Sequence, residues 1–430
     1  MGQKVAVLMR FDKSKLPGLL TTLAAILVPG LALWLRSGYS YGAGLMVLGA
    51  LCFLPRWVRY RQSNGTWLLV ALFLGMAVMW YFLSVLDGGT GQFDRPVKFI
   101  LGAVSLLFAM CYPPTARIFL WGIPLGSAGA GFMALWQVCV LGMERATGYT
   151  NAIQWGNMAL LLGCFSCIYA VSFWHQRSVA WRLLVLAAAA LGALASLLSG
   201  SRGGWLALLP MFFMLMVLVR MYRPQYFGRL LLGCAAIVVA LATVMAFIPR
   251  VSERVDEVYL DVSTYLYAGN SNTSLGTRLE QYRLAVQMIG EKPLLGWGMQ
   301  GYVDEMHRRV DAGSYGQSIR EYNFIHNDFL DIWVKLGVPG VLLQAALFIS
   351  LLWLFWPSRR RMALWPADST PWREALLLRI LGSLMPAMYL AFGMSQQFFV
   401  HNSGIVFFVF LVVALWSSLH GLERASGAVR

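Results

Sequence analysis

Long apolar stretches separated by short polar segments make up most of the chain. A helix needs about 20 mostly apolar residues to cross a bilayer, so the pattern predicts about twelve membrane spans. They cover residues 17–35, 41–55, 66–86, 96–112, 116–141, 152–174, 179–199, 203–221, 228–249, 338–356, 374–395 and 402–420. Because lipid offers no partners to open backbone N–H and C=O groups, the spans are expected to be helical. The predicted fold class is therefore all-α, a polytopic membrane protein.

One long polar segment, residues 250–337, interrupts this pattern. It separates residues 1–249, with nine predicted spans, from residues 338–430, with three. The segment holds 12 of the 19 acidic residues of the chain. A long insertion between packed helices is usually either functional or disordered, and the aromatic and periodic apolar residues here argue against disorder. We therefore expect a folded helical loop that carries the catalytic residues.

The composition agrees with a membrane protein, since 59% of the residues are hydrophobic and 12% are charged, against about 25% charged residues in soluble domains. The formal net charge is +15, and many of the basic residues lie in short loops. With a cytoplasmic N-terminus, the predicted cytoplasmic segments hold 19 Lys and Arg residues and the short loops opposite hold 5. By the positive-inside rule, both termini face the cytoplasm and residues 250–337 face outward, which is the periplasm in a Gram-negative cell. The charge is thus a topology signal, and no nucleic-acid partner is expected.

The sequence motifs give no sign of a metal or a cofactor. All six cysteines lie in apolar stretches, so no disulfide framework is expected in the polar segment. Cys164 and Cys167 have metal-like spacing, but no second pair and no nearby histidine accompany them, and we interpret them as helix-packing residues. The chain also lacks an Asp-x-Asp pair, a phosphate-binding loop and a nucleophile elbow. We therefore expect neither a metal nor a cofactor.

One of the five histidines, His326, stands where the polar segment meets an apolar run. A histidine has an ordinary pKa of about 6.5 and titrates near neutral pH, and ionisable groups close to a membrane are functional candidates. Asn327 and Asp328 follow it directly. A carboxylate among Asp328, Asp331 and Glu321 is a candidate to orient the ring, and the sequence leaves open which of them, if any, does so. The alternative is an interfacial histidine that only forms hydrogen bonds.

Arg278 is predicted to lie in the first turn of a helix. Residues 274–280 open this helix, with Thr277 and Glu280 at the spacing of a capping box. Apolar residues then recur at helical intervals, at Leu279, Tyr282, Val286 and Ile289, before Gly290 and Pro293 end the helix. The free N–H groups and the positive dipole end of a first turn attract anions. The alternative is a solvated surface arginine.

Four further candidates lie on the outward side. Arg202 stands between glycines in a short loop, which permits a close backbone approach to an anion. Arg95 and Lys98 start the fourth span and are candidates for additional cationic contacts. For these three residues the alternative is a charged anchor that snorkels to the membrane interface. His401 is a second histidine at the start of the last span, and we rank it below His326.

Arginines and a histidine on one face indicate one kind of chemistry. Guanidinium groups bind phosphate and pyrophosphate oxygens through paired hydrogen bonds. A neutral imidazole suits deprotonation of an attacking hydroxyl. The combination of Arg202, Arg278 and His326 predicts transfer of a group from a lipid-linked phosphate or pyrophosphate donor.

These residues lie in motifs that resemble the O-antigen ligase family, within the larger O-antigen ligase/polymerase superfamily. The motifs are Ser201-Arg202-Gly203, Thr277-Arg278, Pro293-x-x-Gly296-x-Gly298, His326-Asn327-x-x-Leu330 and Gly337-x-x-Gly340. The resemblance implies a glycosyltransferase of the bacterial inner membrane. Such an enzyme moves O-antigen polysaccharide from undecaprenyl pyrophosphate to a hydroxyl of the lipid A–core oligosaccharide in the periplasm. It uses no metal or nucleotide, and it inverts the anomeric carbon.

The resemblance also implies roles for individual residues. His326 takes the role of the general base, and Arg202 and Arg278 bind the pyrophosphate. We predict substrate contacts for a further set of residues on the same face. These are Arg95, Lys98, Tyr282, Asn327, Asp328 and His401.

The sequence does not exclude several related activities. O-antigen polymerases and O-linked protein oligosaccharyltransferases resemble the same histidine-containing loop. The absence of a soluble domain after Leu419 weakens the oligosaccharyltransferase interpretation, and the loop motifs and length favour a ligase over a polymerase. A transporter of lipid-linked saccharides, in which the arginines form a passive binding site, is the alternative from a different class.

Overall fold

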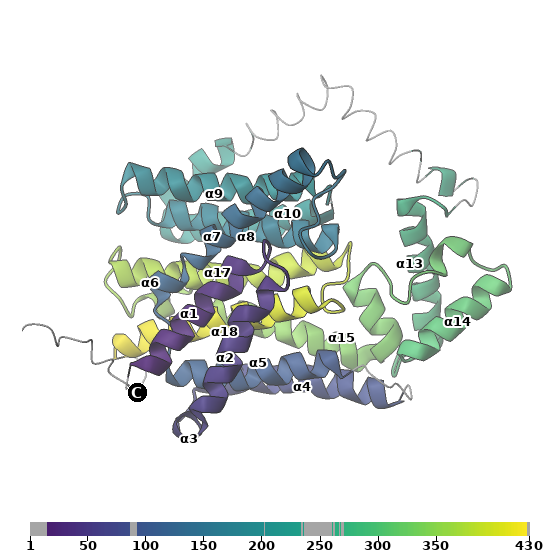
Figure 1. The fold of residues 1–430 in the computed structure, drawn as a ribbon, viewed down its shortest axis with the longest axis horizontal. Coiled ribbons are helices and arrows are strands. Elements are labelled where there is room, and N and C mark those ends of the chain that lie inside the picture. The colour runs from purple at the N-terminus through teal and green to yellow at the C-terminus, as the bar shows by residue number, and fades with distance from the viewer. Residues whose placement is uncertain are drawn as a thin grey trace, which may run out of the picture.

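A computed structural model describes residues 15–86, 93–201, 203–233, 235, 260, 263–265, 267 and 271–427. All regular secondary structure in this part of the chain is helical. Most helices run side by side in one bundle, and α13, α14 and the first turns of α15 lie together beyond one end of it (Figure 1). The predicted all-α fold class is confirmed.

The helices follow one another with mostly short connections. In the first half of the chain they are α1 (Leu16–Leu31), α2 (Gly38–Cys52), α3 (Leu54–Trp57), α4 (Asn64–Leu86), α5 (Asp94–Cys111), α6 (Ala116–Phe119), α7 (Gly122–Leu135), η1 (Trp136–Val140), α8 (Ala152–Ser172), α9 (Val179–Leu198), η2 (Gly203–Ala207) and α10 (Leu208–Tyr222). The second half holds η3 (Pro224–Tyr226), α13 (Ser274–Glu291), α14 (Met299–Asp311), η4 (Gln317–Ile319), α15 (Asp328–Phe355), α16 (Arg359–Met362), α17 (Thr370–Gly393) and α18 (Asn402–Ala425).

Among the described residues, eight helical stretches are long and apolar enough to cross a membrane. They are Asn64–Leu83, Ala116–Val140, Ala152–Ser172, Val179–Leu198, Gly203–Tyr222, Asp328–Phe355, Thr370–Gly393 and Asn402–Ala425. α1 and α2 are apolar but shorter, with 16 and 15 residues, and α5 begins with the charged Asp94, Arg95 and Lys98. Of the predicted span 228–249, all but residues 228–233 and 235 lie outside the described residues. The helices agree with the predicted polytopic membrane protein.

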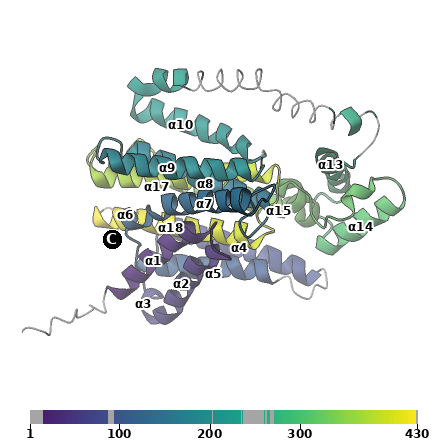
Figure 2. The ribbon, with the colours of Figure 1, turned by 45° about the horizontal axis from the view of Figure 1, so that its top comes forward.

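α18 occupies the centre of the bundle. Every residue from Ser403 to His420 is buried, and the helix packs against α1, α2, α5, α6 and α17. A helix that is apolar all round needs neighbours on every side. Figure 2 shows its yellow ribbon between the layer with α17, α8 and α7 and the layer with α4 and α5. The start of α18 is fixed beside the start of α5, because Lys98 donates a hydrogen bond to Asn402.

α15 begins ten residues earlier than the predicted span 338–356. It runs from Asp328 to Phe355 and breaks at Gly337, whose φ of 63° and ψ of −161° are not helical. Such angles are open almost only to glycine. The residues before the break read as polar loop in the sequence, but Asp331 and Lys335 form an ion pair inside the protein. The boundary predicted at residue 337 is therefore a kink within one helix.

The loop between α13 and α14 binds the carbonyl groups that the kink in α15 leaves open. Trp297 N donates to Val334 O at 2.7 Å. Gly298 N donates to Lys335 O at 3.0 Å. Gly296 has a φ of 71° and passes so close to α15 that a Cβ atom would lie 2.6 Å from the Lys335 carbonyl. The Pro-x-x-Gly-x-Gly motif thus joins the outer helices to α15 through their backbones.

Candidate functional site

His326 lies in the loop before α15 and is held by Gln281 of α13. The backbone N–H of His326 donates to Gln281 Oε1 at 3.1 Å, and Nδ1 of the ring lies 2.8 Å from the same oxygen. Gln281 is fully buried, and its Nε2 donates to Phe324 O at 3.1 Å. These backbone partners identify the oxygen end of the amide. Because an amide oxygen only accepts hydrogen bonds, Nδ1 carries the proton and Nε2 is left with a free lone pair.

Aromatic side chains enclose the ring of His326. Tyr322 and Phe324 meet it edge-on, with centroid distances of 4.9 and 5.1 Å. Burial, and then the positive charge of Arg278 and the nearby His401, together lower the pKa of His326 to about 4. A buried imidazole loses its proton more easily because burial penalises the charged form. His326 is therefore neutral at physiological pH and able to accept a proton.

An internal ion pair fixes the loop that carries His326. Asp331 Oδ1 accepts a hydrogen bond from Ile325 N at 3.0 Å and pairs with Lys335 Nζ at 2.6 Å. Lys335 Nζ in turn donates to Asn323 O at 3.1 Å. Both charged side chains are only 1% exposed. Breaking a buried pair from one side typically costs about 3–5 kcal/mol, so the loop is anchored to α15 immediately before His326.

The side chains of Asn327 and Asp328 also hold α15 in place. Asn327 is its N-cap and accepts hydrogen bonds from Phe329 N at 3.0 Å and Leu330 N at 3.2 Å. Asp328 is 3% exposed and accepts from Phe398 N at 3.0 and 3.1 Å. These contacts tie the start of α15 to the segment between α17 and α18.

The N-terminus of α13 differs from the predicted one. Thr273 is the N-cap, and its hydroxyl accepts a hydrogen bond from Gly276 N at 3.0 Å. The predicted capping box of Thr277 and Glu280 is therefore wrong, and Arg278 lies in the second turn, away from the free N–H groups. Two threonines four residues apart are both good caps, and the sequence pattern does not separate them. Arg278 therefore attracts anions through its own charge, without help from the free N–H groups of the first turn.

Arg278 is a half-buried cation on α13. Within the described part of the chain it makes no hydrogen bond or ion pair. Its charge acts on its neighbours, since after burial it is the next contribution that lowers the pKa of His326. A guanidinium beside a neutral imidazole is suited to an anionic group of a ligand.

Tyr282 joins α13 to two other parts of the site. Its hydroxyl lies 3.0 Å from both His326 O and Met394 O, at the end of α17. Burial raises the pKa of Tyr282, so its hydroxyl keeps its proton and acts as the donor. Tyr282 therefore helps to hold the backbone of His326 in place.

The starts of α5 and α18 form the opposite side of the site. The ring of Phe324 contacts both His326 and His401, at centroid distances of 5.1 and 6.2 Å. Burial, and then the charge of Arg95, lower the pKa of His401. Arg95 stacks on Trp80 at 4.7 Å, and its buried Nη1 has no hydrogen-bond partner in the part of the chain that the structure describes. These contacts bring Arg95 and His401 close to the loop that carries His326.

Two predicted cations remain, Lys98 and Arg202. Lys98 forms an ion pair with Asp94 and a hydrogen bond with Asn402, so its charge is already balanced. Arg202 lies outside the described residues. Of its neighbours, Ser201 donates to Asn157 Oδ1 at 2.6 Å.

Gln281 is the residue of the site that sequence reasoning missed. The partner of the His326 ring is this amide, whereas Asp328 and Asp331 bind backbone N–H groups elsewhere. Glutamine does not titrate, so it draws no attention in a search for acids and bases. The available signal was its position, because Gln281 falls on the buried stripe of α13 that also holds Leu284, Ala285 and Met288.

Together these residues provide a fixed neutral base and a cation, unpaired among the described residues, at one end of the bundle. In the searched, described portion of the chain, no group of three or more His, Cys, Asp or Glu side chains is arranged to hold a metal ion. The geometry suits deprotonation of a hydroxyl next to a negatively charged group.

Comparison with known proteins gives two matches. Residues 187–345 match the family described as O-Antigen ligase, and this range includes Arg202, Arg278 and His326. A protein of Haemophilus influenzae, described as uncharacterized, is 27% identical over 376 residues, which cover 86% of this chain and 91% of that protein.

Proposed function

Because residues 187–345 match the family described as O-Antigen ligase, we propose that the chain is a membrane glycosyltransferase. Its donor is a polysaccharide linked to undecaprenyl pyrophosphate, and its acceptor is a hydroxyl of the lipid A–core oligosaccharide. The observation that carries this proposal is the pair Gln281–His326. With Nδ1 at 2.8 Å from the amide oxygen, the free lone pair on Nε2 is available for the proton of the acceptor.

In the proposed step, the acceptor oxygen attacks the anomeric carbon while Nε2 of His326 takes its proton. The bond between the anomeric carbon and the pyrophosphate oxygen breaks, and the pyrophosphate leaves with the bonding electrons. Attack opposite the leaving group inverts the anomeric carbon. General-base assistance of this kind contributes about 10²–10⁴-fold in rate.

Arg278 stabilises the departing pyrophosphate in this proposal. Its guanidinium has no other hydrogen bond or ion pair within the described residues, and its planar donors match two phosphate oxygens at once. A fixed positive charge aimed at the leaving group stabilises the transition state without reorganisation. The motif match supports stabilisation of the departing pyrophosphate by Arg202 as well.

The other predicted substrate contacts also remain proposals, and the contacts of each residue support them to different degrees. Arg95, with a buried unpaired nitrogen, and His401, beside Phe324, are placed for contact with the donor or acceptor. Lys98 contributes less charge because Asp94 balances it. For Tyr282, Asn327 and Asp328, the hydrogen bonds already described support positioning of the His326 loop in addition to any substrate contact.

We also propose that the enzyme lies in the bacterial inner membrane with both termini in the cytoplasm. The excess of Lys and Arg in the predicted cytoplasmic segments supports this orientation. Residues 250–337, which include Arg278 and His326, then form the catalytic loop in the periplasm.

Turnover by the purified protein in liposomes tests the proposed function. The donor is a synthetic saccharide on undecaprenyl pyrophosphate, and the acceptor is purified lipid A–core. We expect a product in which the saccharide is attached to lipid A–core. Elongation of the lipid-linked saccharide instead would identify a polymerase, and binding of the donor without either product would indicate a transporter.

A further inference from the structure

A second polar site lies between α13 and α14. It is a cavity of about 500 Å³ lined by Arg283, Gln287 and Glu291 of α13 and by residues of α14 and the loop after it. The three α13 residues are four apart and share one helix face. Gln281 lies six residues before Gln287, the middle of the three, and is therefore turned from it by about 120° around the axis. The cavity is thus on a different face of α13 from His326.

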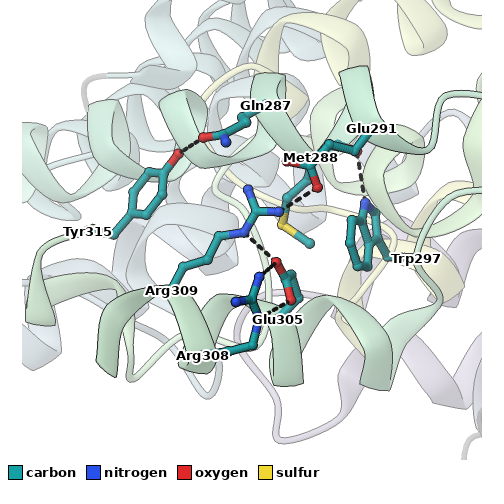
Figure 3. Close-up of polar contacts among 8 residues, drawn as sticks. All are labelled: Gln287, Met288, Glu291, Trp297, Glu305, Arg308, Arg309 and Tyr315. Atoms are coloured by element: carbon teal, nitrogen blue, oxygen red, sulfur yellow. Dashed lines mark hydrogen bonds and ion pairs between the residues drawn. The ribbon is translucent and has the colours of Figure 1, made fainter. Parts of the chain in front are cut away.

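Ion pairs fix the polar groups of this cavity (Figure 3). Arg309 donates from Nε to Glu305 at 2.6 Å and from Nη2 to Glu291 at 2.5 Å. Arg308 binds both oxygens of Glu305, at 2.7 and 2.6 Å. These hydrogen bonds, led by those from Arg308, lower the pKa of Glu305 to about 2. Glu305 is therefore ionised and acts only as an acceptor.

Within the described ranges, one buried donor of the arginines that line the cavity is left without a hydrogen-bond partner. The side chain of Arg309 is 9% exposed, and its buried Nη1 has no hydrogen bond to any residue that the structure describes. Figure 3 shows this third guanidinium nitrogen directed between Tyr315 and Gln287. A buried donor without a partner is unfavourable, and a ligand oxygen that accepted its hydrogen bond would remove this cost.

The charge balance indicates the class of ligand. Arg283, Arg308 and Arg309 are matched by Glu280, Glu291 and Glu305, with which they form ion pairs. A phosphate or carboxylate would therefore meet no net positive charge. A neutral ligand with many hydroxyl groups suits the cavity better, because each hydroxyl both donates to a carboxylate and accepts from a guanidinium. Trp297 and Tyr315 line the same cavity and add apolar surface.

We propose that this cavity is a subsite for a neutral sugar residue of a glycan whose reacting end lies at His326. This assignment rests on the proposed glycosyl transfer. Gln287 lies six residues after Gln281, or about 9 Å along the axis of α13, so one helix positions both the base and the subsite. The glycan is either that of the donor or that of the acceptor, and the two sources share the same chemistry.

Direct binding by the full-length protein in detergent tests the subsite. The probes are two lipid-free oligosaccharides, one released from the donor glycan and one from the acceptor core. Binding is titrated by ligand-observed NMR for the native protein, Gln287→Ala and Arg308→Ala. We expect each variant to bind one probe about three- to tenfold more weakly, as for the loss of one hydrogen bond. The probe affected identifies the source of the glycan.

Gln300→Ala is the matched control. Gln300 lies on α14 and donates to Asp304 at 2.8 Å on the exposed side of the helix, and it does not line the cavity. We expect native affinity for both probes. Native affinity of both cavity variants for both probes would overturn the subsite.

The transfer assay separates the subsite from the proposed function. If both hold, the cavity variants raise the KM of the affected substrate three- to tenfold, with kcat changed by less than about twofold. If the protein binds a probe through the cavity but transfers nothing, the subsite stands and the proposed transfer falls. If transfer proceeds with native KM and native probe affinity in both cavity variants, the subsite falls and the proposed transfer stands.

Discussion

A single oxygen of Gln281 holds both the backbone and the ring of His326. It accepts from His326 N at 3.1 Å and lies 2.8 Å from Nδ1. The ring is thereby fixed in one tautomer and one orientation without a charged partner. A neutral partner leaves the imidazole easier to deprotonate than a carboxylate would, because a negative charge stabilises the imidazolium.

Replacement of Gln281 tests this positioning role. In Gln281→Ala the ring loses its partner, and we expect kcat to fall about tenfold with little change in KM. In Gln281→Glu a carboxylate faces the ring, so the acid limb of the pH–rate profile should move to higher pH. Steady-state kinetics over a pH series measures both effects. An unchanged profile in the Glu variant would show that residue 281 does not act on the ring.

The native enzyme should keep its activity in mild acid. Burial lowers the pKa of His326 to about 4, so the imidazole stays neutral until the pH approaches that value. Below it, the proton occupies the lone pair that the acceptor hydroxyl needs, and transfer falls. The sequence alone suggests a fall near an ordinary imidazole pKa of about 6.5. An acid limb at that higher value would contradict the enclosed ring.

Two substitutions of Arg278 separate its charge from its shape. Arg278→Lys keeps the charge but loses the planar fork, and we expect kcat/KM to fall roughly 10- to 100-fold with an unchanged acid limb. Arg278→Gln loses both the charge and the planar fork. Because the charge of Arg278 helps to lower the pKa of His326, the acid limb of this variant should also move to higher pH.

Arg320→Lys is the control for these arginine variants. Arg320 is 41% exposed and pairs with Asp311 at the surface, so we expect near-native kinetics. Near-native turnover by both Arg278 variants would reduce Arg278 to a surface charge.

Gly337→Ala should destabilise the contact between the α13–α14 loop and the kink in α15. The φ of 63° strains any residue with a Cβ atom, and that atom would lie 2.2 Å from Leu294 O. We expect the strained backbone to cost about 1–3 kcal/mol and the clash with Leu294 O to add to this loss, measured as a fall in Tm in detergent. Gly290→Ala is the control, since nothing lies within 4 Å of its added Cβ and an alanine within a helix gains about 0.5–1 kcal/mol. Equal Tm values for the two variants would refute the role of the kink.

The sequence predicts the membrane helices well because their apolar length is a direct physical requirement. It does not predict the start of α15. Asp331 and Lys335 look like loop residues until their pairing is known, and the pairing depends on the fold. The same holds for Thr273, which caps α13 in place of Thr277.

The chemistry of the site is predictable only in part. His326 and Arg278 stand out because they carry charge or titrate, and the motif spacing groups them. Gln281 carries no charge and does not titrate. Its role follows from the face of α13 that packs against the loop. The low pKa of His326 also depends on the enclosure by Tyr322 and Phe324, which only the folded chain provides.

The transfer rate of His326→Ala, compared with that of His401→Ala, tests the central claim most directly. Both histidines contact Phe324, so the two variants disturb the same aromatic neighbour. With defined donor and acceptor, we expect His326→Ala to transfer at least about a hundredfold more slowly while expression and donor binding stay intact, and His401→Ala to show a milder loss. Native turnover by His326→Ala together with an inactive His401→Ala would contradict the assignment of His326 as the base.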